Sequence, residues 1–180
     1  MNHSPLGYLL RRSLLPGKTS YTDANTTLSL SRKDGETLLL FRTDEVSRVV
    51  DNQYPESFAA HFDLHNKRRS DLVLMVIRER GSADGHLVRL AAIELKTTAD
   101  LSVAIEQLSN TLRALKQKLE RVLGTAFFAP GNLRGIIVAT GSSKSASDAQ
   151  RIKEFEREFN CRPEVCHPKK EDKIRLALGI

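Results

Sequence analysis

The sequence predicts an α/β (α+β) fold in which helices flank a mixed central sheet, with an N-terminal β-hairpin before it. Residues 72–77 form an unbroken apolar run rich in β-branched side chains, which is typical of a buried strand. Residues 101–122 place apolar side chains at alternating steps of four and three, which is typical of a long amphipathic helix. Such a helix can cross a sheet and bring the following strand, 135–140, parallel to its neighbour.

Length and composition limit the class of protein. The 180 residues are 40% hydrophobic and 28% charged, which is the balance of an ordinary globular domain. We therefore expect a single domain over 1–180. Within it, 1–42 would form an arm and the hairpin, 43–141 the core, and 142–180 a C-terminal helix and strand.

No stretch of the sequence is suited to a membrane or to export. Apolar runs stay well below the ~20 residues that cross a bilayer. Two leucines at 9–10 stand before two arginines at 11–12, the reverse of the order in a signal peptide. Cys161 and Cys166 do not make a disulfide framework. We expect a soluble cytoplasmic protein with no membrane partner.

The N-terminal part is expected to be an arm followed by the hairpin. Residues 1–25 contain many turn formers and no clear period, which indicates an irregular lead-in. Asp34-Gly35 stands between apolar side chains at 28–30 and at 36–41. Asp-Gly between two apolar runs favours a hairpin that pairs those two runs.

Two short elements are expected before the buried strand. Thr43 or Asp44 can cap a helix over 43–52. Between 57 and 64, apolar residues alternate with others in the period of a strand, although the spacing of the two phenylalanines there also suits a helix.

The sheet is expected to be built mainly by three strands joined by short loops. These are 57–64, 71–77 and 87–96, arranged as an antiparallel meander, with a polar hairpin loop over 78–86. The helix 101–122 follows the third strand, with possible caps at 97–100 and its end near Gly124.

Further elements are expected beyond the strand at 135–140. Ser147 and Gln150 form a capping box that starts another helix. Residues 163–167 are expected to add a short strand, and 174–178 a weaker one.

Three charged residues lie on two adjacent predicted strands. Asp71 opens the first strand, and Glu94 and Lys96 close the second. Their spacing of two puts Glu94 and Lys96 on one face of the strand. The start of one hairpin strand lies beside the end of the next, so Asp71 and Glu94 can converge. A carboxylate among Leu, Ile and Ala is costly unless it is paired.

Two converging carboxylates suit Mg²⁺ or Mn²⁺. A lysine beside such an ion could orient or help to deprotonate a water molecule, or stabilise negative charge on a phosphate. The alternative is that Asp71 is a turn residue at the start of a strand, and that Glu94 and Lys96 form a surface pair on an edge strand.

The pattern of charged residues and elements resembles that of the PD-(D/E)XK nuclease superfamily. It consists of Asp71, a hairpin, Glu94-Leu95-Lys96 and a long helix. The resemblance implies a restriction-endonuclease-like core with the element order αβββαβ over about 43–141. It implies metal-dependent hydrolysis of phosphodiester bonds in DNA, sometimes RNA. It also implies that Asp71 and Glu94 ligate Mg²⁺ or Mn²⁺ and that Lys96 is the catalytic lysine.

The resemblance extends to two more residues and departs at others. An acid from the first helix would be Glu45, although the helix dipole alone explains an acid in a first turn. Gln107 matches the glutamine of a Q-x-x-x-Y motif on the long helix, but Thr111 stands where tyrosine would be. A solvated helical glutamine is the alternative for Gln107. Ser70 replaces the proline of the motif, and the loop between the two catalytic strands is longer than in compact members.

The charge favours a polyanionic partner. Lys and Arg number 28 against 22 Asp and Glu, a net charge of +6. Beside the arginines at 11–12 and the basic residues at 169–175, two groups are the candidates for contacting nucleic acid. They are Lys67, Arg68 and Arg69 before the first catalytic strand, and Ser143 and Lys144 in a Gly-Ser-Ser-Lys-Ser loop that partly resembles a phosphate cradle.

Zinc is a weaker alternative at two places. His61, Asp63 and His65 would share one face of a strand, but four ligands are not evident. Cys161, Cys166 and His167 likewise offer too few ligands. No nucleophile elbow or dinucleotide fingerprint is present.

The function expected from the sequence is that of a Mg²⁺- or Mn²⁺-dependent nuclease, with DNA favoured as substrate and endonuclease cleavage favoured over exonuclease cleavage. A homodimer or a subunit of a larger complex is expected. The alternatives are a catalytically silent subunit that binds nucleic acid or a partner, and a structural protein in which the motif is accidental.

Overall fold

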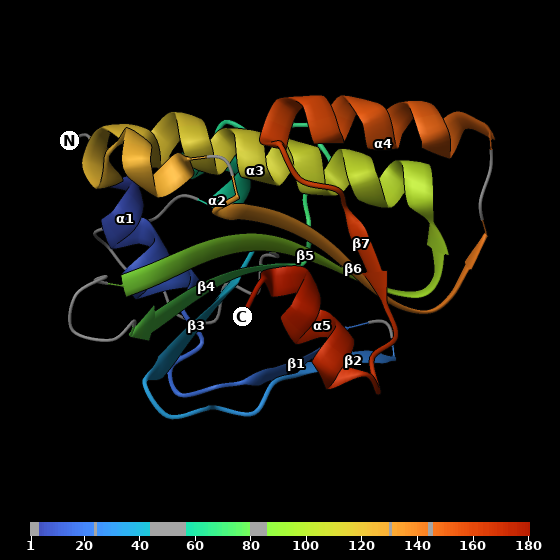
Figure 1. Cartoon of the computed structure of the whole chain (residues 1–180). Coiled ribbons are helices and arrows are strands. Elements are labelled where there is room, and N and C mark those ends of the chain that lie inside the picture. The colour runs from blue at the N-terminus through green and yellow to red at the C-terminus, as the bar shows by residue number, and fades with distance from the viewer. Residues whose placement is uncertain (1–3, 24, 44–56, 80–85, 130, 144–145) are drawn as a thin grey trace.

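The computed structural model describes residues 4–23, 25–43, 57–79, 86–129, 131–143 and 146–180. A five-stranded mixed sheet with the order β3-β4-β5-β6-β7 forms the centre, and helices flank it (Figure 1). A separate two-stranded antiparallel hairpin, β1-β2, lies near the N-terminus. The elements in chain order are α1 (Pro5–Tyr8), the π-helical turn η1 (Leu9–Ser13), β1 (Ser20–Asp23), β2 (Thr26–Ser29), β3 (Glu36–Arg42), α2 (Phe58–His61), β4 (Leu72–Glu79), β5 (His86–Asp100), α3 (Leu101–Leu123), the 3-10 turn η2 (Thr125–Phe128), β6 (Leu133–Ser143), α4 (Ala146–Phe159), β7 (Glu164–Cys166) and α5 (Glu171–Leu178).

The sheet changes direction at β5. The pairs β3-β4 and β4-β5 are antiparallel, whereas the pairs β5-β6 and β6-β7 are parallel. The α3 crossover makes the parallel pairing of β5 and β6 possible, because a direct turn cannot return the chain in the same direction. The expected fold class is confirmed, including the mixed sheet, the flanking helices and an N-terminal hairpin.

Each face of the sheet packs against its own layer. Helices α1, α2, α3 and α4 cover one face, which we call the α3 face, and α5 with the β1-β2 hairpin covers the other (Figure 1). Because side chains alternate along a strand, Val73 and Ala92 lie on the α3 face while Leu74 and Ile93 lie on the other. Both faces are apolar, which explains why β4 and β5 show continuous apolar runs.

Helix α3 forms as the leucine spacing predicts. Asp100 caps it by accepting a hydrogen bond from the Val103 amide at 3.2 Å, and the helix ends before Gly124, whose φ is 82°. Its apolar stripe is buried against the sheet. The buried members of the stripe are Leu101, Ile105, Leu108, Leu112, Leu115 and Leu119.

Gly135 lets α4 approach the sheet closely. A Cβ at this position would lie 2.5 Å from the ring of Phe155, a separation that real Cβ atoms do not show. The glycine of β6 therefore serves the packing of α4 rather than a turn.

The expected pairing within the N-terminal hairpin is wrong. Strand β2 pairs with β1, and β3 is the edge strand of the central sheet, paired with β4. The turn at Asp34-Gly35 exists, since the Glu36 amide donates to the Lys33 carbonyl at 3.1 Å, but it leads into β3 instead of joining two paired strands. β3 pairs elsewhere because its side chains at 38, 40 and 41 are buried in the two cores.

The irregular arm expected at 1–25 is also wrong in part. Ser4 caps α1 through the Gly7 amide, and Pro5 stands at the first helical position, where it fits without strain. Tyr8 and Leu9 are buried on the α3 face. Further along, the Leu15 amide donates to the Leu40 carbonyl, so this segment lines the outer edge of β3, where a bridge also pairs residues 14 and 41.

Two expected strands are short helices. Ser57 accepts a hydrogen bond from the Ala60 amide at 3.0 Å and caps α2, so the phenylalanine spacing at 58–62 reports a helix rather than a strand. The weak strand expected at 174–178 lies in α5, which has acidic residues in its first turn and ends at Gly179 with φ 72°. The helix expected at 43–52 lies outside the described residues.

Within the described part of 43–141 the elements are α2, β4, β5, α3, η2 and β6, so the αβββαβ order expected over that range is not complete there. It is obtained only by adding α1-η1 and β3, with the β1-β2 hairpin after the first helix and α2 between β3 and β4. The first strand of this core, β3, lies within the segment 1–42. Among the described residues, no helix is both long enough and apolar enough to cross a membrane.

Candidate metal site on the central strands

The register of β4 and β5 brings the predicted acids together. Leu72 pairs with Ile93, so Asp71 stands directly across from Glu94 at the next position. Glu94 and Lys96 point to the α3 face, in step with Ala92. The alternative of a surface pair on an edge strand does not fit, because β5 lies between β4 and β6 in the middle of the sheet.

Glu94 is fully buried. Its side chain is 0% exposed, and Nζ of Lys96 lies 2.5 Å from its Oε1. Neither oxygen of Glu94 accepts a well-aligned hydrogen bond from the described residues, although Lys96 and the backbone of Asp71 lie close enough to lower its pKa. The Lys96 side chain is 32% exposed, so the cation reaches toward the surface while the carboxylate stays inside. A buried carboxylate in this position carries a large desolvation cost.

The electrostatics of the pair follow from this burial. The pKa of Glu94 is raised to about 7, first by burial and then by the facing carboxylate of Asp71, while Lys96 and the backbone of Asp71 offset part of the rise. Burial would lower the pKa of Lys96, but Glu94 and the more distant Asp71 and Asp23 outweigh it, so that pKa is raised. Lys96 is therefore charged at neutral pH, and Glu94 is poised to gain or lose a proton.

Asp71 is held by the backbone of β5. The Leu95 amide donates to its Oδ2 at 2.7 Å, and the Thr43 amide donates to its backbone carbonyl at 3.1 Å. Asp71 is half-buried, in contrast to the fully buried Glu94. The two carboxylates therefore differ in access to solvent although they face each other.

Gln107 lies on α3 beside the segment that leads into β4. Its Nε2 donates to the Arg69 carbonyl at 2.9 Å, and its Oε1 is buried without a hydrogen-bond donor among the described residues. Thr111 accepts a hydrogen bond from the Ser70 amide at 2.9 Å. The structure thus connects Gln107 to the chain just before Asp71, and the solvated alternative does not describe it.

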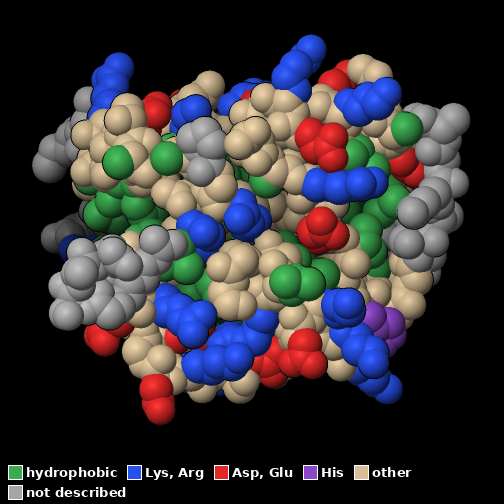
Figure 2. All heavy atoms as spheres, in the orientation of Figure 1, with side chains coloured by type: hydrophobic (Ala, Val, Ile, Leu, Met, Phe, Trp, Pro, Cys, Tyr) green, Lys and Arg blue, Asp and Glu red, His purple; other side chains and the backbone are tan. Residues whose placement is uncertain are grey.

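The residues predicted to contact nucleic acid differ in placement. Lys67 and Arg68 are exposed, whereas Arg69 is half-buried and donates through Nε to the Thr43 carbonyl at 2.9 Å. The backbone of Ser143 continues strand β6 instead of forming a loop, and its side chain lies outside the description. Lys144 and Glu45 lie outside the described residues, so the structure does not place them. Figure 2 shows basic side chains interspersed with acidic ones over one face of the molecule.

Asp23 is an acid near the site that the sequence did not indicate. It ends β1, and its charge contributes to raising the pKa of Lys96. The hairpin brings it near the end of β5 that carries Lys96. No signal in the sequence could have shown this, because β1 lies in the segment that shows no hydrophobic period.

The two zinc alternatives fail on geometry. His61 lies in α2, and Asp63 follows it in a left-handed conformation with φ 54°, forming an ion pair with Lys118. They do not share the face of a strand with His65. Cys161 and Cys166 are free thiols, and burial raises the pKa of Cys166 to about 11. Within the described parts of the chain, no group of three or more His, Cys, Asp or Glu residues is placed to hold a metal ion.

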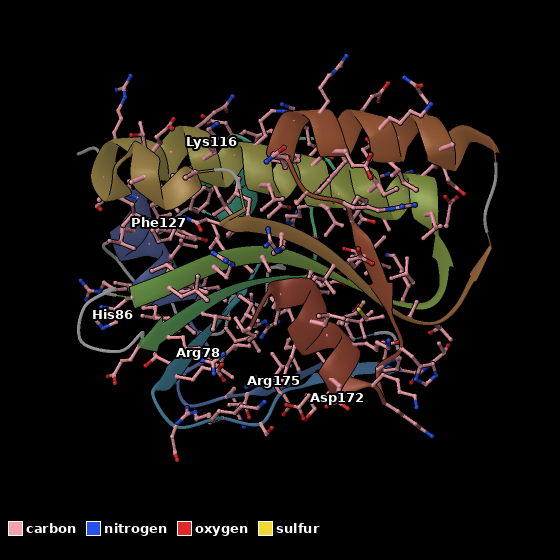
Figure 3. The ribbon with its side chains drawn as sticks, viewed as in Figure 1. Arg78, His86, Lys116, Phe127, Asp172 and Arg175 are labelled. Carbon is pink, nitrogen blue, oxygen red and sulfur yellow. The ribbon has the colours of Figure 1, made fainter. Side chains whose placement is uncertain are left out.

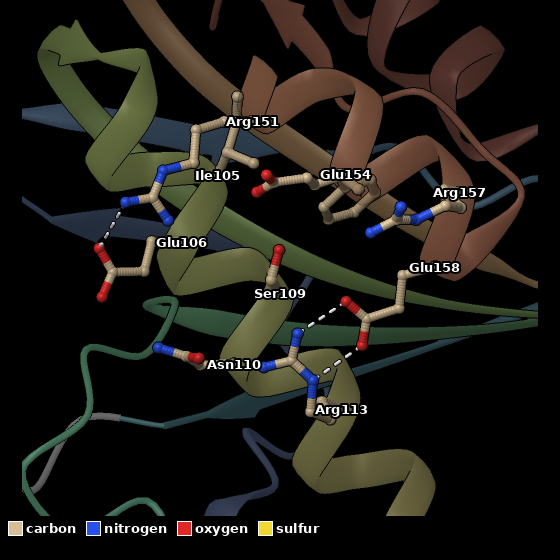
Figure 4. Close-up of a pocket in the computed structure, with 10 residues that line it drawn as sticks. Ile105, Glu106, Ser109, Asn110, Arg113, Arg151, Glu154, Arg157 and Glu158 are labelled. Carbon is tan, nitrogen blue, oxygen red and sulfur yellow. Dashed lines mark hydrogen bonds and ion pairs between the residues drawn. The ribbon is translucent and has the colours of Figure 1, made fainter. Parts of the chain in front are cut away.

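A well-defined cavity lies elsewhere. It occupies about 440 Å³ between α3 and α4, and Figure 4 shows charged side chains of both helices around it. Arg113 donates to both carboxylate oxygens of Glu158, at 2.7 and 2.6 Å, and Arg151 lies 4.0 Å from Glu106. Neither Asp71, Glu94 nor Lys96 lines it. Its opposite charges neutralise each other, so we place the candidate chemistry at the strands.

The donor set fits a hard divalent cation. Mg²⁺ is usually held by one or two carboxylates with several water molecules, which is what Asp71 and Glu94 can offer. Oε2 of Glu94 is buried without a well-aligned hydrogen-bond donor among the described residues, whereas Oε1 contacts Lys96. Two protein carboxylates do not make a closed structural site, so the remaining ligands would be water or substrate.

Comparisons with known proteins add little to this geometry. No family model matches the chain, and no curated protein matches it. Among solved structures, the chain is similar to one described as the MspJI restriction endonuclease in complex with a 27-mer oligonucleotide, at 14% identity and a TM-score of 0.31. The match covers 66% of this chain and 26% of that chain, so this chain spans about a quarter of its length. A likeness this weak carries no argument about function.

Proposed function

We propose that the protein is a divalent-cation-dependent nuclease that hydrolyses phosphodiester bonds, with DNA favoured as the substrate and endonuclease cleavage favoured. The observation that carries this proposal is the buried Glu94 carboxylate, which faces Asp71 across two central strands and has Lys96 beside it. Two acids and one lysine at one end of a sheet are the groups that the resemblance to PD-(D/E)XK nucleases assigns to catalysis.

The balance of charge supports a cation at this place. Asp71 and Glu94 repel each other, and the pKa of Glu94 rises to about 7 despite the contact with Lys96. One lysine that is 32% exposed does not compensate two carboxylates. A divalent ion between them would favour the ionised form of both acids.

Each residue has a distinct proposed task. Asp71 and Glu94 hold Mg²⁺ or Mn²⁺, which when bound polarises a phosphate and lowers the pKa of water. Asp71 keeps its orientation through the Leu95 amide. Lys96, half-buried and charged, orients the attacking water or stabilises negative charge on the phosphate. Glu45 remains a proposed third ligand, and Gln107 acts next to the start of β4.

The substrate would approach from the side of the exposed basic residues. Lys67 and Arg68 stand three or four positions before Asp71 and are exposed. Lysine and arginine contacts to phosphates position nucleic acid without reading its sequence. Ser143, the last residue of β6, and Lys144 after it remain proposed contacts. A homodimer or a larger complex is proposed to supply the rest of the binding surface.

Cleavage assays with matched glutamine variants test this function. Linear, circular, single-stranded and branched DNA, with RNA in parallel, are incubated with Mn²⁺, Mg²⁺ or a chelator. We expect cleavage only with metal, and a loss of about 100-fold or more in Glu94→Gln. Glu106→Gln, the same change at a partly exposed position of α3 that faces α4, should cleave like the wild type. Full activity of Glu94→Gln would contradict the proposal.

A second candidate is a catalytically silent subunit that binds nucleic acid or a partner protein. The 2.5 Å contact between Lys96 and Glu94 favours it, because that contact partly compensates the buried acid without a metal. A folded protein that binds DNA in a salt-dependent manner but cleaves none of the substrates with either metal would support this candidate.

A further inference from the structure

The chain segment before Asp71 is fixed from two sides. On one side, α3 donates from Asn110 to the Arg68 carbonyl at 3.0 Å and from Gln107 to the Arg69 carbonyl at 2.9 Å. Thr111 accepts from the Ser70 amide at 2.9 Å. Three successive residues are therefore each bonded to a side chain of one helix. We call Gln107, Asn110 and Thr111 the α3 clamp.

Thr43 holds the same segment from the other side. Its hydroxyl donates to the Ser70 carbonyl, and its amide donates to the Asp71 carbonyl at 3.1 Å. Ser70 and Thr43 are both fully buried. Ser70 thus has its amide and its carbonyl bonded to side chains of two different elements, which leaves the backbone next to Asp71 little freedom.

The clamp is rigid because of where it lies on α3. Residues 107, 110 and 111 share one side of the helix at the i, i+3 and i+4 spacing. Leu108 and Leu112 beside them are 0% exposed and fix the rotation of the helix against the sheet. Thr111 itself is 0% exposed, and a buried hydroxyl requires the kind of partner that the Ser70 amide provides.

We propose that the α3 clamp, and Thr111 above all, sets the position of the Asp71 carboxylate. Thr111 is a positioning residue, since it contacts the backbone of Ser70 and neither of the two acids. Its hydrogen bond fixes the start of β4, which fixes the hydrogen bond from the Leu95 amide to Asp71. The role of Asp71 as a metal ligand rests on the proposed function, whereas its position does not.

The first experiment measures position without metal. Hydrogen exchange of the Leu95 amide reports the bond to Asp71 in the metal-free protein. Thr111→Val removes the acceptor at nearly constant volume and leaves the buried Ser70 amide unpaired, so Leu95 exchange should rise about tenfold. Thr111→Ser keeps the hydroxyl and should retain exchange close to that of the wild type.

A destabilised control separates positioning from stability. Ile105→Val removes a buried methyl group from the same helix without touching residues 68–70. It should leave Leu95 exchange and Mn²⁺ affinity unchanged after correction for global stability. Unchanged Leu95 exchange in Thr111→Val, or an equal rise in Ile105→Val, would overturn the role of the clamp.

The second experiment measures Mn²⁺ binding by calorimetry. Thr111→Val should weaken binding about tenfold, as changes to groups behind metal ligands do, while Thr111→Ser restores it. If the wild type binds no Mn²⁺ yet Thr111→Val still accelerates Leu95 exchange, the positioning role stands and the proposed metal site fails. If Mn²⁺ binds the wild type and Thr111→Val equally well, the clamp does not set the ligand.

Discussion

Two buried carboxylates on the same sheet have different partners. The Glu36 side chain on β3 is 0% exposed, and Arg175 on α5, itself 5% exposed, donates twice to its Oε2, at 3.1 and 2.5 Å, although its Oε1 has no well-aligned hydrogen-bond donor among the described residues. Glu94 on β5 is equally buried, but its partner Lys96 is 32% exposed and a second acid faces it. Figure 3 labels Arg175 on the α5 side, away from the α3 face.

The difference separates a structural ion pair from a candidate site. A planar guanidinium can make two hydrogen bonds to one carboxylate, and both partners are then removed from solvent for good. A lysine on a flexible stem leaves the acid open to another ligand. We infer that Glu36 ties α5 to the sheet, whereas Glu94 is kept available at the expense of stability.

The largest effect is expected from breaking the structural pair. Arg175→Met should destabilise the protein by about 3–5 kcal/mol, because it leaves the Glu36 carboxylate buried and unpaired. Urea unfolding measures the change. Arg157→Met, at an exposed position of α4, serves as control and should change stability little. A loss of less than about 1 kcal/mol for Arg175→Met would show that the two carboxylates do not differ as described.

A smaller effect is expected at Glu94, where a substitution should raise the stability of the folded state at higher pH instead of lowering it. Its folded pKa of about 7 lies above the ordinary 4.5, so the folded state binds a proton more tightly than the unfolded state. Glu94 therefore contributes its full stabilisation of the folded state below pH 4.5, and this contribution is lost as the pH rises through 7. Relative to wild type, Glu94→Gln should therefore gain up to about 3 kcal/mol between pH 5 and pH 8 in the presence of a chelator.

Urea unfolding at the two pH values measures this difference. Glu106→Gln controls for the chemistry of the substitution, because Glu106 is partly exposed and lies outside the site. A constant difference between wild type and Glu94→Gln over this range would show that Glu94 is ionised throughout.

The smallest effect sharpens the comparison within the site. Asp71 raises the pKa of Glu94, so Asp71→Asn should lower that pKa below 7 while burial still holds it above the ordinary value. Carboxyl carbon NMR measures the titration. A titration of Glu94 that is identical in both proteins would mean that the two acids do not sense each other.

The sequence contains enough to predict the strands that carry the charges. Alternation on β5 puts Glu94 and Lys96 on one face, and the antiparallel pairing of β4 with β5 puts Asp71 across from Glu94, so two local rules suffice. The long helix was equally accessible, because its leucine spacing extends over six turns. These predictions need only the spacing of residues close together in the sequence or the pairing of two consecutive strands.

The rest of the site depends on contacts between distant segments. Thr111 contacts Ser70 across 41 positions, and Arg175 contacts Glu36 across 139. No period or motif encodes such pairs. The pairing of β3 was missed for the same reason, since the strong local turn at Asp34-Gly35 favoured a hairpin that tertiary packing overrode. The start of α1 was visible in Ser4-Pro5, a cap followed by a favoured first residue.

The edges of the central sheet limit how copies of this chain could associate. Residues 14 and 15 bond to the outer side of β3, and β7 at the opposite edge is only three residues long. Exposed strand edges invite sheet-to-sheet growth, and covering or shortening them discourages it. The covered outer side of β3 should therefore resist sheet-to-sheet growth from that edge of the native protein.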